Sequence, residues 1–549
     1  MIMRWLEKWR AFRAWFERRG MEPFVAFAYV GLIALFLAAV GQFYSPGKGF
    51  SYLIAFGGDD SRARLSKLQK IDFHVEQGSA GYDAQYYAQI AMDPSLQNRE
   101  LPKVVDNLPY RARRILFPTT AYVLGLGRPP LILEAYALQN VLSWLMLAVI
   151  LLHWFPARTW DYFFRWAGVL LSLGLCVSFR NALVDGPSLM LITLGLYFVD
   201  KKRLWLATVV LGLSGLGKET NLLSGSALLP RLKGRWKEWL LPLLRGGLIA
   251  VPLALWLCYL SIKLGPVMDP GIRNFGLPFA AYLHKWQAVL AELPDAAWPN
   301  LGALWGLLML ISLTVQFLFF VLRPCWSQAW WRVGLSFVLL MVVLGDAVWE
   351  GYPGAASRVL LPMQVAFNVL VPIGRGWRWV LLAGNLTLFA APFVLEPPAT
   401  EGYVLGGNSS LFSTSAGQAM SLQFGQGWYA SEGSRSFYWS WARGNATQEI
   451  RNPHPFIVNS RLRFSIFTVD RRTVRLKFNG EELWSTRLGE HQSVSVSLSA
   501  VPLRQGKNLL EWETDEPTVA LTYDPRQLAF VVQNLRLDVF SEMPAKKAP

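Results

Sequence analysis

The chain has 549 residues, of which 53% are apolar and only 16% are charged, and its mean hydropathy is +0.28. Soluble proteins have about a quarter of their residues charged, so this composition favours a membrane protein. The net charge of +16 does not indicate nucleic-acid binding, because the basic residues lie at the ends of apolar stretches and not on one soluble face. Three cysteines without metal-site spacing offer no disulfide framework, and five scattered histidines argue against a zinc site.

The first 396 residues contain apolar stretches that are long enough to cross a hydrocarbon core. Helices are expected there, because lipid offers no partners to free backbone groups. We predict about eleven transmembrane helices, because several windows of about 18–24 residues carry almost no charge. They lie at residues 23–43, 131–154, 166–179, 188–199, 204–230 (a pair of helices broken at residues 217–220), 239–264, 301–322, 333–348, 359–373 and 379–394.

The loops between these stretches divide by charge, and the division predicts an orientation. Lysines and arginines concentrate on one side, whereas most acidic residues lie in the alternate loops. By the positive-inside rule, the basic N-terminus, residues 1–20, is cytoplasmic. The first apolar stretch stays as an anchor, because no small-residue cleavage site follows it. The transmembrane domain is expected at residues 21–396, and its first non-cytoplasmic loop at about residues 44–130.

Apolar residues alternate with period two in the last third of the chain, which is typical of strands. Turn signals such as Asn479-Gly480 separate the runs. We predict an all-β, jelly-roll-like sandwich at residues 397–549, placed outside the cytoplasm by the odd number of spans. The clearest runs are Leu462/Phe464/Ile466, Val474/Leu476/Phe478, Val494/Val496/Leu498 and Leu535/Leu537/Val539.

The first outer loop holds a carboxylate among aromatic residues. If residues 82–92 form a helix, Asp83, Tyr86 and Tyr87 share one face of an amphipathic segment that would lie along the membrane surface. A sugar hydroxyl needs a base within about 3 Å to lose its proton, and aromatic faces suit sugar rings. The alternative interpretation of the tyrosines is interfacial anchoring.

Three arginines, Arg111, Arg113 and Arg114, follow in the same loop and break the positive-inside pattern. The rigid fork of donors on arginine suits a phosphate. A base candidate and an anion-binding candidate therefore lie about 30 residues apart in one loop. The alternatives are contact with lipid headgroups and pairing with nearby acids.

Further outer charges lie at the ends of apolar stretches. Asp185 precedes one stretch, and Arg358 opens another, where a guanidinium usually faces a cavity. Lys218 and Glu219 lie at the helix break and could simply pair with each other. Asp59 and Asp60 follow two glycines and could form only a turn.

The order of these motifs resembles bacterial membrane glycosyltransferases of the GT-C superfamily. The resemblance rests on Tyr-Asp-x-x-Tyr at residues 82–86, then Tyr-x-x-Arg-Arg-Ile-Leu-x-Pro at residues 110–118, with Asp185 and the Lys-Glu-Thr of residues 218–220. The sandwich, with Gly-Trp-Tyr at residues 427–429, resembles the extracytoplasmic domain appended to some members. The resemblance covers nearly the whole chain and implies a GT-C-like fold for the membrane part.

The resemblance implies an inverting transfer of a sugar from a polyprenyl-phosphate donor to an extracytoplasmic glycan or lipid-linked acceptor, in the bacterial inner membrane. It implies Asp83 as catalytic base, with Asp59 and Asp60 as rivals. The implied donor-phosphate ligands are Arg111, Arg113, Arg114, Lys218 and Arg358, and the implied substrate-binding residues are Gln85, Tyr86, Tyr87, Asp185 and Glu219.

Metal use stays open at this point. This sequence has Asp-Ala where protein mannosyltransferases of the superfamily have Asp-Glu. A second acid would have to come from elsewhere, and Asp185 and Asp93 are candidates, so a divalent cation is neither required nor excluded.

Two other functions compete with the transferase. A transporter or flippase of lipid-linked saccharides would line its pathway with the same charges, but we find no internal repeat of the kind many transporters have. A glycan-binding scaffold would use the membrane part only as an anchor, for which this many spans are excessive. An anchor should tolerate Asp83→Asn, and a transferase should not.

Overall fold

The computed structural model describes residues 22–45, 47–58, 64–76, 80–230, 236–265, 271, 274–295, 302–351, 354–396, 402–414, 419–429, 431–433, 437–521 and 524–540. The chain forms two compact units. The first consists of Met1–Phe56, Asp60–Val75 and Gly81–Leu395, and the second consists of Gly57–Asp59, Glu76–Ala80 and Glu396–Pro549. Two short strands, β1 (Phe56–Gly57) and β2 (Val75–Glu76), pair with each other in the first loop.

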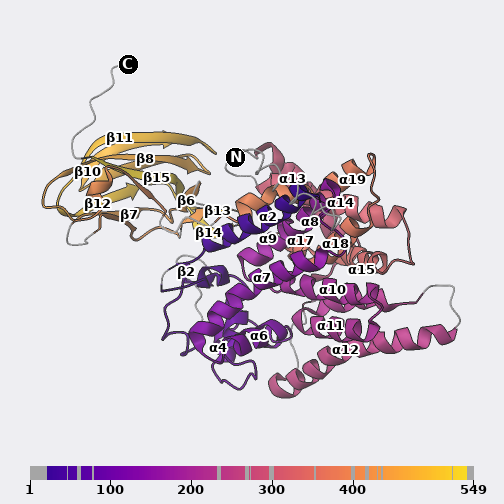
Figure 1. Ribbon diagram of the computed structural model, residues 1–549. Helices are drawn as coiled ribbons and strands as arrows, with labels where there is room; N and C mark the ends of the chain where they lie inside the picture. The colour runs from indigo at the N-terminus through magenta and orange to yellow at the C-terminus, as the bar shows by residue number, and fades with distance from the viewer. Residues whose placement is uncertain are drawn as a thin grey trace, which may run out of the picture. The chain divides into compact units, whose positions relative to one another are not determined.

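The first unit is helical (Figure 1). Its α-helices are α2 (Pro23–Gly41), α3 (Ala84–Ala91), α4 (Leu101–Val104), α5 (Leu108–Arg111), α6 (Leu116–Leu124), α7 (Pro129–Leu151), α8 (Trp160–Leu170), α9 (Leu173–Arg180), α10 (Asp185–Asp200), α11 (Leu204–Gly217), α12 (Trp236–Leu264), α13 (Ala280–Glu292), α14 (Gly302–Leu322), α15 (Ala329–Val343), α16 (Asp346–Trp349), α17 (Ala355–Val359), α18 (Leu361–Leu370), α19 (Trp377–Ala383) and α20 (Ala391–Val394). Its 3₁₀ segments are η1 (Ser51–Ile54), η2 (Glu219–Leu228), η4 (Leu293–Asp295) and η5 (Leu386–Ala390).

Within the described residues, four helices are long and apolar enough to cross a membrane. They are α2, α7, the Trp239–Leu264 part of α12, and α14. Two pairs bent by 45°, α8 with α9 and α19 with Leu386–Val394, raise the number to six if each pair is one span. By length and composition this is a multi-pass membrane protein. The predicted number of eleven spans is not confirmed.

The stretch predicted at residues 166–179 differs from expectation, because it is part of a bent pair. Arg165, expected in a loop, is buried inside α8. Its guanidinium bonds Asp161 and donates to the carbonyl oxygens of Asn368 and Val371, each at 2.7 Å. The last carbonyls of a helix have no intrahelical partner, so a buried arginine can satisfy the end of α18.

The helix pair expected at residues 204–230 divides within the expected break. Helix α11 ends at Gly217, Lys218 is extended with φ −162°, and the 3₁₀ segment η2 follows. The Asn221 side chain donates to the Ser214 carbonyl oxygen at 2.7 Å, which satisfies an acceptor at the end of α11. Helices α10, α11 and α12 pack side by side (Figure 1), and α7 packs against α10. The break thus presents Lys218 and Glu219 beside the start of α10.

The second unit contains two antiparallel sheets and a parallel edge strand. Its strands are β3 (Val404–Gly407), β4 (Ser421–Phe424), β5 (Glu432–Gly433), β6 (Tyr438–Trp441), β7 (Ala446–Asn452), β8 (Val458–Thr468), β9 (Arg472–Phe478), β10 (Glu481–Leu488), β11 (Ser493–Leu503), β12 (Gly506–Glu513), β13 (Val519–Leu521), β14 (Asp524–Leu528) and β15 (Phe530–Phe540). One sheet has the order β10-β9-β12-β7-β4, the other has the order β11-β8-β15-β6-β5, and β3 pairs with β15 in parallel. Strands β13 and β14 form a separate pair, and a 3₁₀ turn, η6 (Ser409–Leu411), follows β3.

The two sheets share one apolar core, which makes the unit a sandwich. Phe464 on β8 meets Trp512 on β12 with ring centroids 5.0 Å apart, so the contact joins the two sheets. Burial alternates strictly along β9, as period-two patterning requires. Asn479 and Gly480, the expected turn between β9 and β10, have φ values of 50° and 87°. Positive φ at both central residues is what a tight hairpin needs.

Candidate functional site

Asp83 lies directly before α3 and is held by Arg111. The Arg111 Nη2 atom is 2.9 Å from Asp83 Oδ1, and the same guanidinium binds both oxygens of Asp106, at 3.0 and 2.7 Å. The Asp83 side chain is 36% exposed, and its Oδ2 atom has no partner among the described residues. One oxygen of Asp83 is therefore fixed while the other is available.

Helix α3 is not the surface helix that its amphipathic pattern suggested. All eight of its residues are buried, including Gln85, Tyr86 and Tyr87. The Arg111 guanidinium lies over the rings of Tyr86, Tyr87 and Tyr110, at 5.2, 5.7 and 5.8 Å from their centroids. The segment is buried because it packs against α4 and α6 of the first loop and against α7, so the tyrosines support Arg111 and do not anchor the surface.

Arg114 connects the first loop to the break after α11. Its Nε atom donates to Glu219 at 3.1 Å, Nη1 donates to the Tyr87 hydroxyl at 2.8 Å, and Nη2 donates to the Tyr110 hydroxyl at 3.2 Å. Burial raises the pKa of Tyr87, although Arg114 and Arg111 oppose the shift. The Tyr87 hydroxyl therefore stays protonated at neutral pH and accepts from Arg114 as a neutral group.

Burial would lower the pKa of the Arg111 guanidinium, but the hydrogen bonds to Asp106 and the nearby Tyr87 and Asp83 together raise it well above its ordinary value. Arg111 is thus a permanent cation, and the charge that faces Asp83 does not change over any physiological pH range.

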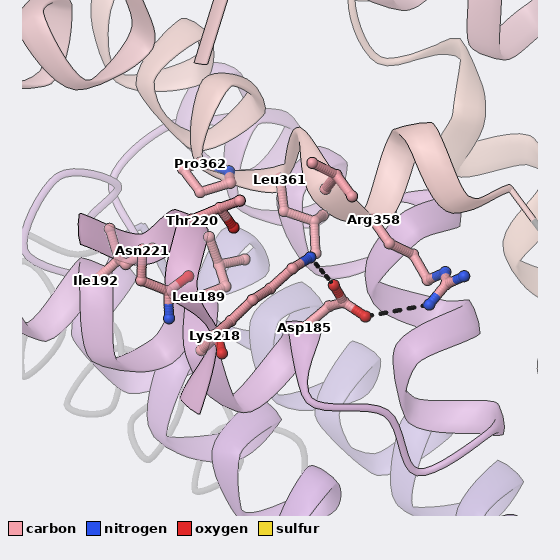
Figure 2. Close-up of a pocket in the computed structure, with 11 residues that line it drawn as sticks. Asp185, Leu189, Ile192, Lys218, Thr220, Asn221, Arg358, Leu361 and Pro362 are labelled. Atoms are coloured by element: carbon pink, nitrogen blue, oxygen red, sulfur yellow. Dashed lines mark hydrogen bonds and ion pairs between the residues drawn. The ribbon is translucent and has the colours of Figure 1, made fainter. Parts of the chain in front are cut away.

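Asp185, the first residue of α10, is bound from two sides (Figure 2). Lys218 Nζ reaches Oδ1 at 2.5 Å, and Arg358 Nη1 reaches Oδ2 at 3.2 Å. Arg358, on α17, also donates from Nη2 to the Tyr82 hydroxyl at 3.0 Å. All three charged side chains are at most 10% exposed, so removal of one would leave another charge buried and unpaired.

These side-chain contacts and two stretches of backbone close a ring, which we call the ionic ring. It passes from Tyr82, just before α3, to Arg358, Asp185 and Lys218, continues along the backbone to Glu219, and passes through Arg114 to Tyr87, which the backbone joins to Tyr82. Arg113 lies beside it, over the Tyr110 ring at 5.7 Å. Five cations and four carboxylates, counting Asp83, Asp106 and Arg111, leave a formal charge of +1.

A narrow pocket opens at the Asp185 side of the ring, lined by Lys218 and Arg358 among other residues (Figure 2). Two buried polar atoms there lack a described partner, namely the Ser188 hydroxyl and the Arg358 Nε atom. Buried polar groups are normally hydrogen-bonded, so unpaired ones beside a pocket favour a polar ligand.

The structure brings together eleven of the residues named from the sequence. They are Asp83, Gln85, Tyr86, Tyr87, Arg111, Arg113, Arg114, Asp185, Lys218 and Glu219, and Arg358 joins them from α17. Asp59 and Asp60 lie outside the described residues. Asp93 lies in a turn, where its Oδ2 accepts from the Asn98 backbone at 2.6 Å.

Three partners in this network were not assigned a role from the sequence: Tyr82, Asp106 and Tyr110. Asp106 lies five residues before Arg111, so the proximity of opposite charges was the available signal. Within the described ranges, no three His, Cys, Asp or Glu side chains converge as metal ligands. Asp83, Asp185 and Glu219 each face a cation, so the described residues do not form a site that fits a divalent ion.

No protein-family model matches the chain, and no curated protein matches it. Solved structures similar to it include the following two. Arabinosyltransferase EmbB from Mycobacterium smegmatis has 10% identity and a TM-score of 0.26, covering 92% of this chain and 64% of its own. A mutant of CBM29-2, a family 29 carbohydrate-binding module, has 15% identity and a TM-score of 0.16, covering 25% of this chain and 94% of its own.

The chain spans less than two thirds of the length of the arabinosyltransferase. At such TM-scores and identities, neither likeness determines what this chain does. The fold and the contacts define the class at this point: a multi-pass helical membrane protein with a β-sandwich and a buried ionic ring beside a half-exposed carboxylate.

Proposed function

We propose that the protein is a membrane glycosyltransferase, which moves a sugar from a polyprenyl-phosphate donor to an extracytoplasmic glycan or lipid-linked acceptor with inversion. The observation that carries the proposal is the pairing of two chemistries within one network. Asp83 offers an available carboxylate oxygen, and Arg114, Lys218 and Arg358 are held in the ionic ring, which includes the preceding residue Tyr82. Displacement of a phosphate by a hydroxyl needs both a base and cations.

Asp83 would act as the base. The acceptor hydroxyl attacks the anomeric carbon, a carbon–oxygen bond forms to the acceptor, and its proton passes to Asp83 Oδ2. Arg111 binds Oδ1, so the carboxylate is oriented before the acceptor arrives. Such orientation lowers the entropic cost of reaching the attack geometry.

The bond from the anomeric carbon to the donor phosphate breaks, and its electrons leave with the phosphate. Lys218 and Arg358 line the pocket that would receive this group, and the unpaired Arg358 Nε and Ser188 hydroxyl supply further donors. Arg114, which is paired with Glu219, adds a further positive charge to the ionic ring. Donors fixed in advance stabilise developing charge without reorganisation.

Arg111 takes a different role from the other cations in this proposal. Two carboxylates and three tyrosine rings surround its guanidinium, which leaves little room for a phosphate. We assign it as the positioning residue of Asp83. Tyr86 and Tyr87 lie against the Arg111 guanidinium, and Gln85 is buried beside them in α3.

The proposed orientation follows the charges of the loops. The basic N-terminus would be cytoplasmic, and the ionic ring, with the sandwich, would lie on the outer side of a bacterial inner membrane. The lipid tail of the donor would then enter between helices from the bilayer.

The test is transfer of labelled sugar from a panel of polyprenyl-phosphate sugars by the purified full-length protein in lipid. We expect turnover by the wild type and none by folded Asp83→Asn. Asp93→Asn is the matched control, because Asp93 belongs to the same loop and only accepts hydrogen bonds within its own turn. Turnover in Asp83→Asn would move the base to Asp59 or Asp60. Saturable donor binding without turnover in the wild type would overturn the transferase in favour of a transporter.

A further inference from the structure

A second pocket lies at the end of the α10–α11 pair that is remote from Asp185. It is lined by Lys202, Arg203, Leu204, Trp205, Leu206 and Arg245. Helix α10 begins at Asp185 and ends at Asp200, and an α-helix rises about 1.5 Å per residue, so most of this helix separates the two sites. The ionic ring and this pocket are therefore distinct.

Arg245 is the unusual residue of this pocket. It lies inside α12, in the part that is long and apolar enough to span a membrane, and it is only 9% exposed. Its Nε atom is buried without a partner, and no described residue forms a hydrogen bond or ion pair with its guanidinium. Among the described residues, its cation–π contact is with the Trp205 ring, 4.9 Å from the centroid. A buried guanidinium loses most of its hydration, and one cation–π contact replaces only part of that loss.

Asp200, the last residue of α10, is close in sequence to the pocket residues Lys202 and Arg203 but is not a counter-ion of Arg245. Asp200 accepts from the Trp154 indole at 2.8 Å and lies 3.5 Å from His153. Lys202 adds a second cation and has φ +58°, a left-handed conformation in which glycine or asparagine is preferred. The chain thus keeps a lysine where glycine would be less strained.

The start of α11 opens into the same pocket. Arg203 precedes the helix, and Leu204, Trp205 and Leu206 are its first three residues. Their backbone N–H groups have no intrahelical acceptor, and the positive end of the helix dipole lies there. Cations, free amides and an unpaired buried arginine together fit an anion.

The surface around Arg245 is apolar. Leu241 and Leu248, four residues before it and three after it, share its face of α12 and are 45% and 39% exposed. Leu206 on α11 is also 45% exposed. Leucines on a membrane-spanning helix suit acyl chains, whereas a free anion would gain nothing from them.

We propose that this pocket binds the phosphate headgroup of an anionic phospholipid, with Arg245 as the principal ligand and with the acyl chains along α11 and α12. Basic pockets between transmembrane helices recognise such headgroups. By the charges of the loops, the pocket would face the cytoplasmic leaflet, opposite the proposed transfer site.

The experiment measures lipid retention by the full-length protein in neutral detergent, using native mass spectrometry with phosphatidylglycerol, phosphatidylcholine or inorganic phosphate. We expect the wild type to prefer phosphatidylglycerol over phosphatidylcholine by about tenfold or more, because both lipids carry the phosphate but the choline cation would meet the like charges of Lys202, Arg203 and Arg245. Arg245→Leu should reduce the preference to less than about twofold.

The variants separate binding from folding. Arg245→Leu should melt no lower than the wild type in detergent alone, because it removes a buried charge that lacks a partner. Lys202→Gly should weaken phosphatidylglycerol binding while the melting temperature holds or rises, since glycine relieves the strain. Arg323→Leu is the matched control, because Arg323 also lies over an indole, that of Trp377, but outside the pocket. It should bind like the wild type.

Three outcomes would overturn the proposal. The first is an unchanged lipid preference in Arg245→Leu. The second is full displacement of phosphatidylglycerol by millimolar inorganic phosphate, which would assign the pocket to a free anion. The third is a melting temperature of Arg245→Leu below that of the wild type without lipid, which would mean that the protein itself supplies a counter-ion to Arg245.

Discussion

At the residue scale, the arrangement around Asp83 depends on a neighbour that touches no substrate in the proposed mechanism. Asp106 accepts from both Nε and Nη2 of Arg111, and Nη2 also reaches Asp83. The bidentate pair fixes the plane of the guanidinium, and this plane sets the direction of the Asp83 carboxylate.

We therefore expect Asp106→Ala to lower kcat of sugar transfer by about tenfold or more, with a smaller change in the KM for the donor, because Asp83 loses its orientation. Asp106→Asn keeps one acceptor for Arg111 and should lose less activity than Asp106→Ala. Steady-state kinetics of the wild type, Asp106→Ala and Asp106→Asn tests this prediction. A rise in KM with constant kcat would instead place Asp106 in donor binding.

Asp185 supports a prediction about stability. Its substitution by alanine would leave Lys218 and Arg358 buried without a counter-ion, and removal of one partner from a buried ion pair costs about 3–5 kcal/mol. Lys218→Met leaves Asp185 paired with Arg358 and should cost less. Denaturant unfolding in mixed micelles compares the two variants. Equal losses of stability in Asp185→Ala and Lys218→Met would contradict the prediction, because Arg358 would then not be an effective partner of Asp185.

The residues of the site could be predicted from the sequence better than their partners. Outer-loop charges and the Tyr-Asp motif identified Asp83, Arg114, Lys218 and Arg358 as candidates. The sequence did not predict that Asp185 would lie between Lys218 and Arg358, since these residues are separated by 33 and 173 positions. Such pairing is set by tertiary packing, which charge and spacing alone do not report.

At the scale of elements, the position of Arg358 depends on how closely α17 approaches α9. A Cβ atom added at Gly174, in the first turn of α9, would lie 2.6 Å from the Ser357 carbonyl oxygen and 2.9 Å from the Arg358 nitrogen. These are backbone atoms, so they can only make room if α17 moves as a whole. The glycine therefore sets the distance at which Arg358 meets Asp185.

We expect Gly174→Ala to displace α17 and to reduce sugar transfer by about tenfold or more, since small misplacements of catalytic groups are costly. Gly246→Ala is the matched control: it lies inside α12, and its added Cβ would meet nothing within 4 Å. That variant should be neutral or more stable by about 0.5–1 kcal/mol. Wild-type turnover by Gly174→Ala would show that the α9–α17 contact does not control the site.

Secondary structure could be predicted from a long apolar stretch, as in α2 and α7, or from a dominant period of two, as in β8. The sequence missed the bend between α8 and α9, where both halves are apolar and continuous. There the Ser172 hydroxyl donates to the Val169 carbonyl oxygen at 2.8 Å, which helps end the first half. The hydropathy of a stretch gives its apolar content, but it does not show that a side-chain hydroxyl will bind a backbone carbonyl oxygen and end the helix.

At the scale of the whole molecule, the two units have separate hydrophobic cores. Separate cores predict separate unfolding transitions. In the sandwich, Asp538 is almost fully buried and contacts Arg463 and Arg536. Burial alone would raise the pKa of Asp538, but the hydrogen bonds from Arg536 and Arg463 outweigh it and hold the pKa below its ordinary value.

A carboxyl whose pKa is lower in the folded state stabilises the fold above the unfolded pKa, and this contribution is lost as pH falls through the folded pKa. We expect Asp538→Asn to lower the stability of the sandwich at neutral pH, with the difference from wild type shrinking below about pH 4. Hydrogen exchange in β8 and β15 of the full-length protein, followed against pH, measures this. Equal exchange in both proteins at pH 7, or a constant difference down to pH 2, would contradict the prediction.

The ionic ring joins Tyr82 to Arg358, residues separated by 276 positions. A ribosome adds residues in order, so the first loop and Lys218 are complete long before α17 leaves the tunnel. We expect that a chain released before residue 358 can pair Asp185 with Lys218 but cannot close the ring. The site is thus finished late in biosynthesis, and a prematurely terminated copy in the membrane would lack the proposed transfer activity.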